Sequence, residues 1–437
     1  MSAKYSNVAE YFDYKGRQFA EKCTNCGLCL EACPVFPLTK VGHIGPKAAI
    51  EKVTDLLKGG EPSEEAYEVV FSCNRGCGLC AKACPEGLMP YYLGFIPAAA
   101  KLTSAGMKPP PLTYQHLPGH RHNFGSVFSA LQVKPSEARW LKRPPPDPKP
   151  VDVVFFTGCA PLGIPHILLE AIEIMEVMGI DFVTLAGGEF CCGMVPTLWG
   201  NLEAAQGMGQ ELISAIAAFR PKKAVFFCSG CYVMCMGTLP RFCDVPFQSY
   251  EVAQFLLDNL ERIPLKHSVD KLVTVHDSCH VARLGTFELT RQLLQAVPGI
   301  RLVEMAHSRA DALCCGGYTN SVHPEIGESM RRPPMEEAEA TGAEVMATNC
   351  SGCHQGFAPL EGQYPFEVRN YMSLIAEAVG VQHEDRFKKY ATLADVPLVL
   401  AEARECISAS DLSIEEMEKV LPDYLDRFCL KHGRAGA

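Results

Sequence analysis

Apolar residues from position 151 onward alternate between short continuous runs and stripes with helical spacing. Residues 151–156 (VDVVFF), 181–186 (DFVTLA) and 224–227 form the runs, which predict buried strands. The stripes predict two helices, with Ile167, Ala171, Met175 and Met178 in the first and Leu202, Ala205, Met208, Leu212, Ile216 and Phe219 in the second. Strands that alternate with helices indicate a mostly parallel α/β sheet.

The same order of elements returns roughly 120 residues later. Residues 272–275, 302–305 and 344–347 are the corresponding predicted strands. In both copies each predicted strand is followed by one or two cysteines. Open α/β sheets build their sites at the carboxyl ends of strands. The repeat therefore predicts two α/β units, each with a cysteine-lined site at one edge of its sheet.

Cysteine content and charge narrow the possible functions. The chain has 22 cysteines among 437 residues and a formal net charge of −10. An acidic balance disfavours nucleic acid as a partner, because phosphate binding needs a basic face. Residues 1–14 contain no apolar signal region, and no apolar run reaches the roughly 18 residues of a membrane span. We therefore expect a cytoplasmic protein whose cysteines bind metal, with any membrane association made through a partner subunit.

Two cysteine motifs precede the repeat. The first, Cys23, Cys26, Cys29 and Cys33-Pro34, matches the C-x2-C-x2-C-x3-C-P pattern that binds a [4Fe–4S] cluster. The second has three residues instead of two between its first two cysteines, and the cysteine before proline ligates the other cluster in two-cluster proteins. We therefore assign two cubane clusters, one to Cys23, Cys26, Cys29 and Cys84, and the other to Cys73, Cys77, Cys80 and Cys33. A structural zinc site is the alternative, although the two Cys-Pro endings are not typical of zinc.

These patterns predict an α+β protein with five segments. They are a mainly α-helical, two-cluster ferredoxin-like domain (1–105), a Pro-rich linker (106–150), two α/β units with mostly parallel sheets (151–270 and 271–385) and a helical tail (386–437). We expect the linker to be an extended spacer. Ser413 and Glu416 form a candidate capping box in the tail. Pro333-Pro334 is expected to interrupt the helix before the last predicted strand.

Each α/β unit carries five cysteines in the same order: one, a vicinal pair followed by glycine, and a C-x2-C pair. The sets are Cys159, Cys191, Cys192, Cys228 and Cys231 in the first unit, and Cys279, Cys314, Cys315, Cys350 and Cys353 in the second. Glycine permits the tight turn that lets vicinal thiolates reach one metal assembly. Five thiolates exceed the four that tetrahedral zinc takes, which favours a multi-iron cluster.

This spacing resembles the CCG cysteine-rich domain of heterodisulfide reductase B subunits. Residues 275–285 (VHDSCHVARLG) also resemble the stretch before that family's second CCG motif. A ferredoxin domain joined to two CCG units is similar to the fused D-type heterodisulfide reductase subunit and to iron–sulfur subunits of sulfate-reducer membrane redox complexes. The resemblance covers roughly residues 20–365.

The resemblance implies that each five-cysteine set holds a noncubane [4Fe–4S] cluster, with the substrate disulfide between the two clusters. It also implies an oxidoreductase that passes electrons through the two cubane clusters to the noncubane pair. Relatives in lactate, glycolate and glycerol-3-phosphate oxidation systems often have incomplete motifs. Both motifs are complete here, which favours reduction of a disulfide, or oxidation of thiols, over conduction alone.

Several other residues lie near these cysteines in the sequence. His280 and His354 are candidate proton donors to a leaving thiolate, and Arg283 is a candidate for binding an anionic substrate group. A hydrogen bond to cluster sulfur or a structural ion pair are the alternatives for these residues. Asp277 is expected in a turn or cap. The remaining cysteines, Cys235, Cys243, Cys406 and Cys429, are predicted to be small buried hydrophobic residues.

The expected partners are a membrane cytochrome b or quinone-reacting subunit, or a flavoprotein, together with a small or protein-borne disulfide. The sequence contains no dinucleotide-binding or Walker motif, so a flavin or nicotinamide would belong to another subunit. Three further hypotheses remain open: an electron-transfer-only subunit of a membrane complex, the iron–sulfur subunit of a lactate, glycolate or glycerol-3-phosphate dehydrogenase, and a zinc-stabilised interaction protein.

Overall fold

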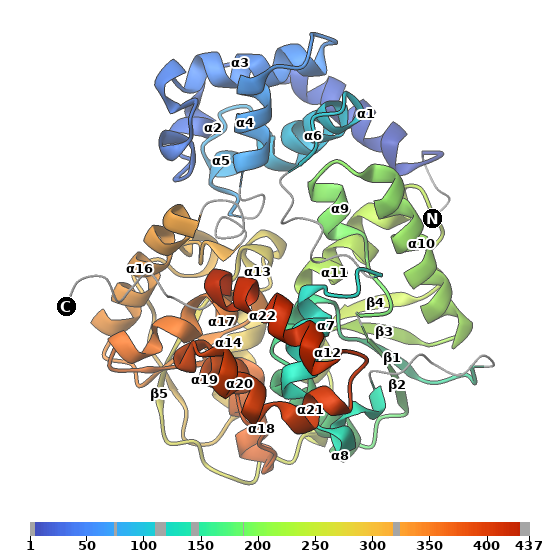
Figure 1. Ribbon diagram of the computed structural model, residues 1–437, viewed down its shortest axis with the longest axis vertical. Helices are drawn as coiled ribbons and strands as arrows, with labels where there is room; N and C mark the ends of the chain where they lie inside the picture. Colours follow the sequence, from blue (N-terminus) through green and yellow to red (C-terminus); the bar gives the residue numbers. More distant parts are fainter. Residues whose placement is uncertain are drawn as a thin grey trace.

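Two parallel four-stranded sheets lie side by side beneath a helical layer formed by the first hundred residues (Figure 1). The computed structural model describes residues 5–73, 77–109, 119–140, 148–186, 188–317 and 324–428. We call residues 5–105 the N-terminal layer, 151–270 the first half and 271–385 the second half. Among the described residues, none of the helices has the length and apolar character needed to cross a lipid bilayer.

The first half contains a parallel sheet with strand order β2-β1-β3-β4. Its strands are β1 (Val153–Phe156), β2 (Phe182–Leu185), β3 (Lys223–Phe226) and β4 (Gln248–Glu251). Its main helices are α8 (His166–Val177), α10 (Leu202–Ala218) and α12 (Val252–Leu257). Three strands coincide with predicted ones. The fourth, β4, was not predicted, because its sequence QSYE is polar and lies at the sheet edge.

The second half repeats this arrangement with the order β6-β5-β7-β8. Its strands are β5 (Leu272–His276), β6 (Arg301–Leu302), β7 (Val345–Thr348) and β8 (Glu367–Asn370). Its main helices are α14 (Phe287–Ala296), α16 (Pro324–Ala340) and α18 (Tyr371–Val379). The unpredicted strand β8 has the polar sequence EVRN and lies at the edge of the second sheet that corresponds to the position of β4 in the first. The fold class predicted from the sequence is confirmed.

One apolar core joins the two halves. Val153 and Phe155 from the first sheet and Val273 and Val275 from the second belong to a single buried cluster. Helix α8 packs against α18, and α12 packs against α14, so helices from both halves fill the space between the sheets. Burial of this continuous apolar surface fixes the two halves relative to each other.

The N-terminal layer shares a second core with the outer face of the first sheet. Its helices are α1 (Val8–Lys22), α2 (Leu28–Glu31), α3 (Pro46–Leu57), α4 (Glu64–Ser72), α5 (Leu79–Lys82) and α6 (Phe95–Ser104). Phe12, Phe19 and Phe71 are buried in one cluster with Val154 and Phe156 of β1. The layer therefore rests directly on the first half, and its cysteines are held by a packed core.

The segment predicted as an extended linker contains a buried helix. Helix α7 (Phe124–Gln132) begins at Asn123, whose side chain accepts a hydrogen bond from the Ser126 amide, 2.9 Å. Phe124, Val127, Phe128 and Leu131 alternate at helical spacing and join the core between the two sheets. The expectation of a spacer is wrong for this part, because four buried apolar side chains give it a packing face. The Pro-rich residues 110–118 and 141–147 lie outside the described residues.

The tail is helical, as predicted. It consists of α19 (Arg386–Leu393), α20 (Val396–Glu402), α21 (Arg404–Ser408) and α22 (Ile414–Phe428). Ser413 and Glu416 form the predicted capping box: the Ser413 amide donates to Glu416 Oε2 (2.8 Å), and the Glu416 amide donates to Ser413 Oγ (3.2 Å). Cys429 lies outside the described residues.

Helix α16 continues through Pro333 and Pro334, so the predicted interruption is wrong. Met335 and Ala338, which follow the prolines, are fully buried against the outer face of the second sheet. Their burial holds the last turns of the helix in place despite the backbone hydrogen bonds that proline removes.

Candidate metal centres

The first ferredoxin-like set comprises Cys23, Cys26, Cys29 and Cys84. These four cysteines line one small cavity in the N-terminal layer. Cys23 caps the end of α1, Cys29 lies in α2, and Cys84 follows α5. Burial, reinforced by the neighbouring thiols, raises the pKa of Cys29 to about 12. A thiol placed like Cys29 would not ionise without a cation nearby. The structure brings together the four residues that the sequence assigns to one cluster.

The second ferredoxin-like set comprises Cys33, Cys73, Cys77 and Cys80. They line a second cavity, which Cys29 also borders, so the two sets are adjacent. Gly78, with φ of 73°, starts the short helix that carries Cys80. Residues 74–76, where this motif departs from the ferredoxin pattern, lie outside the described residues. Each set therefore combines three cysteines of one motif with the cysteine that precedes proline in the other motif, as predicted from the sequence.

The first-half set lies at the carboxyl ends of β1, β2 and β3. Cys159 follows β1, the pair Cys191-Cys192 follows β2, and Cys228 and Cys231 follow β3. The thiols interact in a continuous chain: Cys159 with Cys191, Cys191 with Cys192, Cys192 with Cys231, and Cys231 with Cys228. The neighbouring thiols of Cys191 and Cys231 lower the pKa of Cys192 to about 7. Five sulfur atoms therefore gather at one edge of the sheet.

Two glycines make room for this gathering. A Cβ atom on Gly158 would lie 2.7 Å from Cys228 Cβ and 3.2 Å from Cys231 Sγ. Gly193 has φ of 81°, and its amide donates to Cys191 Sγ at 3.4 Å. A larger residue at position 158 would enter the space around the sulfurs, and one at position 193 would collide with the Ala205 backbone, 2.3 Å from its carbonyl oxygen. The backbone is thus shaped to approach a sulfur-rich group closely.

The second-half set repeats the arrangement at the ends of β5 and β7. Cys279 begins α13 (Cys279–Leu284), and Cys350 precedes α17 (Ser351–Phe357), which contains Cys353. Cys353 Sγ lies 3.3 Å from Cys315 Sγ, and the Gly316 amide donates to Cys314 Sγ at 3.4 Å. The thiols of Cys314 and Cys353 hold the pKa of Cys315 well below its usual value, as happens at Cys192.

The donor sets fit iron–sulfur clusters. Every cysteine within the described residues is free of disulfide bonds, and eighteen of them fall into the four sets. Of the cysteines predicted to be buried hydrophobic residues, Cys235 and Cys406 are buried and Cys243 is half-buried. Cys235 lies beside the first-half set, close enough to influence Cys191 and Cys192.

His280 lies between the two halves. Its Nδ1 is 3.6 Å from Cys279 Sγ, and its Nε2 would lie 3.5 Å from a Cβ atom on Gly230, which sits between Cys228 and Cys231. Burial, reinforced by the charge of Arg283, lowers the pKa of His280 to about 3, so the ring is neutral near pH 7. A single imidazole therefore touches one cysteine set and reaches toward the other.

Arg283 faces the N-terminal layer. Its guanidinium lies over the ring of Tyr91, 5.1 Å from the centroid, and its charge acts on both Cys77 and Cys279. Tyr91 carried no sequence signal for this role. Nearby, Lys82 Nζ pairs with Asp311 Oδ1 at 2.7 Å across the same boundary. Arg283 thus lies where the second ferredoxin set meets the second-half set.

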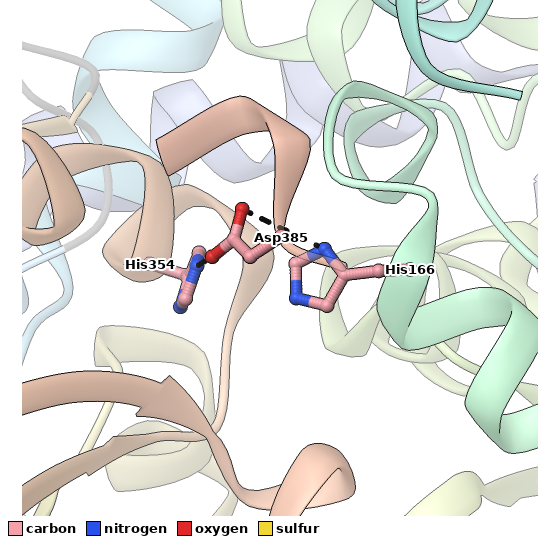
Figure 2. A group of neighbouring side chains, drawn as sticks. All are labelled: His166, His354 and Asp385. Atoms are coloured by element: carbon pink, nitrogen blue, oxygen red, sulfur yellow. Dashed lines mark hydrogen bonds and ion pairs between the residues drawn. The ribbon is translucent and has the colours of Figure 1, made fainter. Parts of the chain in front are cut away.

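The other histidines near the cysteines have separate partners. His354 Nε2 is 2.6 Å from Asp385 Oδ2, in a group that also contains His166 (Figure 2). His276 Nε2 bonds to the Leu313 carbonyl at 3.1 Å, and His307 pairs with Glu337 at the surface.

Asp277, expected in a turn or cap, instead forms a buried ion pair. Its carboxylate receives two hydrogen bonds from the Arg291 guanidinium, at 2.8 and 2.9 Å, and one from the Arg309 amide at 2.7 Å. Arg291 also binds Glu304. The sequence prediction missed this network because its interacting members are 13 to 32 residues apart. The network fixes the turn that precedes Cys279.

Known protein families match both parts of the chain. The cysteine-rich CCG domain matches residues 153–235 and 273–358, and the 4Fe-4S dicluster domain matches residues 19–88. These ranges contain all eighteen cysteines of the four sets. The resemblance seen in the sequence is therefore confirmed, and the chain is an iron–sulfur protein.

Three curated relatives illustrate the range of the similarity. The D-type subunit of dihydromethanophenazine:CoB–CoM heterodisulfide reductase from Methanosarcina acetivorans is 27% identical over 403 residues, covering 83% of this chain and 95% of the relative. Lactate utilization protein A of Oceanobacillus iheyensis is 30% identical over 217 residues, covering 46% of this chain and 85% of the relative. The glycolate oxidase iron-sulfur subunit of Escherichia coli is 25% identical, covering 82% and 93%.

Proposed function

We propose that this chain, a member of the CCG cysteine-rich domain family of iron–sulfur oxidoreductases, reduces a disulfide or runs the reverse oxidation of thiols. The D-type subunit of heterodisulfide reductase belongs to the same family. The observation that carries the proposal is the pair of complete five-cysteine sets with one histidine, His280, between them. A chain that only conducts electrons has no need for two such sets on either side of a buried imidazole.

The residues that would hold the clusters are the four sets described above. Cys23, Cys26, Cys29 and Cys84 would hold one cubane cluster, and Cys33, Cys73, Cys77 and Cys80 the other. The first-half and second-half sets would each hold a noncubane [4Fe–4S] cluster. Bound there, the clusters would supply one-electron transfer and iron atoms with affinity for substrate sulfur.

The overall reaction consumes two electrons and two protons. The S–S bond breaks, each sulfur gains one electron and one proton, and two thiols leave. The electrons come from an external donor, for which we propose a membrane cytochrome b or quinone-reacting subunit, or a flavoprotein. Two of the relatives named above are themselves described as subunits.

The chain's own residues determine where electrons enter the two halves. Cys77 of the second ferredoxin set lies beside Cys279 and Cys314 of the second-half set. The adjacent positive charge of Arg283 favours negative charge at this boundary. Electrons delivered through the N-terminal layer would therefore reach the second half before the first. We therefore propose that Arg283 acts in electron entry, in preference to the substrate-anion role suggested by the sequence.

His280 is the residue best placed to act on a substrate sulfur. Its ring lies against Cys279 and reaches toward the segment between Cys228 and Cys231. A disulfide held between the sets would meet this ring, which could donate a hydrogen bond to a leaving thiolate. His354 is turned toward Asp385, and we assign it no part in this step.

A second candidate function is the iron–sulfur subunit of a hydroxyacid oxidation system. The similarity to the glycolate oxidase subunit, which extends over 82% of this chain, supports it. It predicts a flavoprotein partner and no turnover of disulfides.

The test combines iron analysis with disulfide turnover on the full chain purified anaerobically. We expect about sixteen iron atoms per chain and reduction of a low-molecular or protein disulfide by a reduced artificial donor. His280→Gln should keep the iron and lower turnover by roughly 100-fold, within the range for loss of one positioned hydrogen-bond donor. His307→Gln, which changes an exposed histidine of the same half, is the matched control. Full iron without turnover on any disulfide would favour the second candidate function, and about eight iron atoms would remove the noncubane clusters.

A further inference from the structure

Three side chains outside the cysteine sets converge at the junction of the two halves and the tail. His166 lies at the start of α8, His354 lies in α17, and Asp385 caps α19. Figure 2 shows the two imidazole rings approaching the carboxylate from opposite sides. One ligand atom from each residue lies within 4.8 Å of the other two. The three residues come from segments far apart in the sequence, so the fold alone creates this group.

The group is buried, and its hydrogen bonding is incomplete. His166 and His354 are 4% and 1% exposed. His354 Nε2 lies 2.6 Å from Asp385 Oδ2, and Asp385 Oδ1 accepts a hydrogen bond from the Lys388 amide at 2.9 Å, so both carboxylate oxygens have partners. His166 Nδ1 is 3.8 Å from Asp385 Oδ1, beyond hydrogen-bond range, and has no other hydrogen-bond partner in the described chain. Buried polar atoms without hydrogen-bond partners are rare and destabilise the folded state, so we expect His166 Nδ1 to bind a ligand.

We propose that His166, His354 and Asp385 bind a divalent transition-metal ion of the zinc class. Two imidazole nitrogens and one carboxylate oxygen are a ligand set that zinc accepts, with bonds of about 2.0–2.2 Å. Two donors on one ion can be separated by up to about twice that length, so the 3.8 Å gap between His166 and Asp385 fits an ion between them. The ion would replace the His354–Asp385 hydrogen bond and would give His166 Nδ1 its missing partner.

An adjoining cavity leaves room for a fourth ligand. A cavity of about 440 Å³ is lined by His166, His354 and Asp385, together with Glu170, His383 and Lys388. A water molecule from this cavity could complete four-coordination, and the cavity gives the ion a path of entry. Glu170 lies one helical turn after His166, and Ser373 Oγ donates to its Oε2 at 2.6 Å. These polar groups would surround the ion without entering the cysteine sets.

Such an ion would tie three parts of the chain together. His166 belongs to the first half and His354 to the second half, and Asp385, the last residue of the second half, caps the first helix of the tail. His354 also follows Cys353 directly, so the ion would fix the helix that carries a cysteine of the second-half set. The inference uses none of the cysteines and does not rest on the proposed disulfide chemistry.

The test measures zinc and iron together in the full chain. Anaerobically purified protein with its iron content established is incubated with Zn²⁺, passed through a desalting column and analysed for both metals. We expect about one retained zinc per chain in the wild type and less than about one-tenth of that in His166→Ala, with iron unchanged. His383→Ala, which removes another histidine of the same cavity that bonds to Glu173 at 2.9 Å, should retain the zinc.

Two further measurements distinguish zinc bound at His166, His354 and Asp385 from zinc bound by cysteines. They also distinguish a metal site from a group of side chains that only bond to one another. Zinc X-ray absorption should give a nitrogen and oxygen shell near 2.0–2.1 Å, and a sulfur shell near 2.3 Å would overturn the proposal. Zinc should raise the thermal midpoint of the wild type but not that of His166→Gln, which keeps the size of the side chain. Equal zinc retention in wild type and His166→Ala, or none in either, would mean that the three residues form only a hydrogen-bonded tie.

Discussion

The first and second halves share one scaffold but surround their cysteines with different charges. Both sheets have the same strand order, and both cysteine sets lie at the ends of equivalent strands. Around the first-half set the neighbours are mostly apolar or sulfur, including Cys235. Around the second-half set lie His276, His280, Arg283 and Arg331.

One pair of equivalent positions shows the contrast directly. The glycine after the first vicinal pair contacts Ala205, and the glycine after the second contacts Gly327. Four residues further along each helix lie Gly209 in the first half and Arg331 in the second. Gly209 lies against Cys192 and Leu239, whereas Arg331 is 5% exposed and its charge acts on Cys315. The two copies thus share a backbone arrangement, but at this position only the second carries a buried positive charge.

This difference in charge indicates that the two similar cysteine sets can have unequal roles in electron transfer. Positive charge stabilises the more negative, reduced form of a nearby redox group. The second half has that charge and also lies beside Cys77, so we infer that it accepts electrons from the N-terminal layer. The first half, without such charges, would receive them across His280.

The strongest test of the unequal roles of the two halves is to remove one cysteine from each vicinal pair. Cys192→Ser and Cys315→Ser should each lose about four of the sixteen iron atoms. The consequences should then differ. Without the second-half cluster, reduction of the first-half cluster by a donor should slow by more than about tenfold, because its route through the second half is lost. Without the first-half cluster, the second-half cluster should be reduced at the wild-type rate.

Rapid-freeze EPR after mixing with reduced donor would measure both rates, with the ferredoxin signals as an internal control in each variant. If the first-half cluster of Cys315→Ser is reduced as fast as in the wild type, the two halves accept electrons independently. The inferred order would then be wrong, although the cluster assignment would stand.

Much of this architecture could be predicted from the sequence. Six of the eight strands were predicted, because each is an apolar run with a turn and a cysteine behind it. The grouping of eighteen cysteines into four sets was also predicted from their spacing, and the structure brings the members of each set together. Strands β4 and β8 were missed, because edge strands with polar sequences have no apolar signature.

Contacts between distant segments could not be predicted. Arg331 lies 16 residues after Cys315 on a helix that two prolines were expected to interrupt, and nothing local indicates that it is buried. His166 and Asp385 are separated by more than 200 residues, and the packing of α8 against α18 brings them together. Residue type and spacing reveal ligands that act together locally, but not side chains that meet through the tertiary fold.

A smaller effect would sharpen the electrostatic contrast between the halves. Arg331→Met should lower the reduction potential of the second-half cluster and leave that of the first-half cluster unchanged. At an effective dielectric constant of about 20 and a separation of about 8 Å, one charge contributes roughly 2 kcal/mol, or about 90 mV for one electron. EPR-monitored redox titration would measure both potentials in the same sample.

Arg331→Lys is the matched control for this change, because it keeps the positive charge and should recover most of the potential. Equal shifts in both clusters would show that the substitution acts through a general change of structure. No shift in either would remove Arg331 from the explanation of the asymmetry.

The smallest expected effect concerns stability at another pair of equivalent positions. Glu251 ends β4 and precedes α12, and Asn370 ends β8 and precedes α18. The Asn370 side chain accepts a hydrogen bond from the Met372 amide, 3.0 Å, whereas Glu251 makes no such cap, is 7% exposed, and its Oε2 has no hydrogen-bond partner in the described chain. Burial raises the pKa of Glu251 from 4.5 to about 6.

Because the folded state binds the proton more tightly than the unfolded state, Glu251 lowers stability as pH rises from about 4.5 to 6, and the loss persists above pH 6. Glu251→Gln should therefore raise the free energy of unfolding by about 1–2 kcal/mol at pH 7.5, with the gain shrinking toward zero near pH 4.5. Anaerobic denaturant unfolding across this pH range would measure the gain, and Glu261→Gln, at an exposed position of the same half, should give none. A gain that did not change with pH would trace the effect to packing or hydrogen bonding. The buried charge of Glu251 would then not explain the difference between the two halves at this strand end.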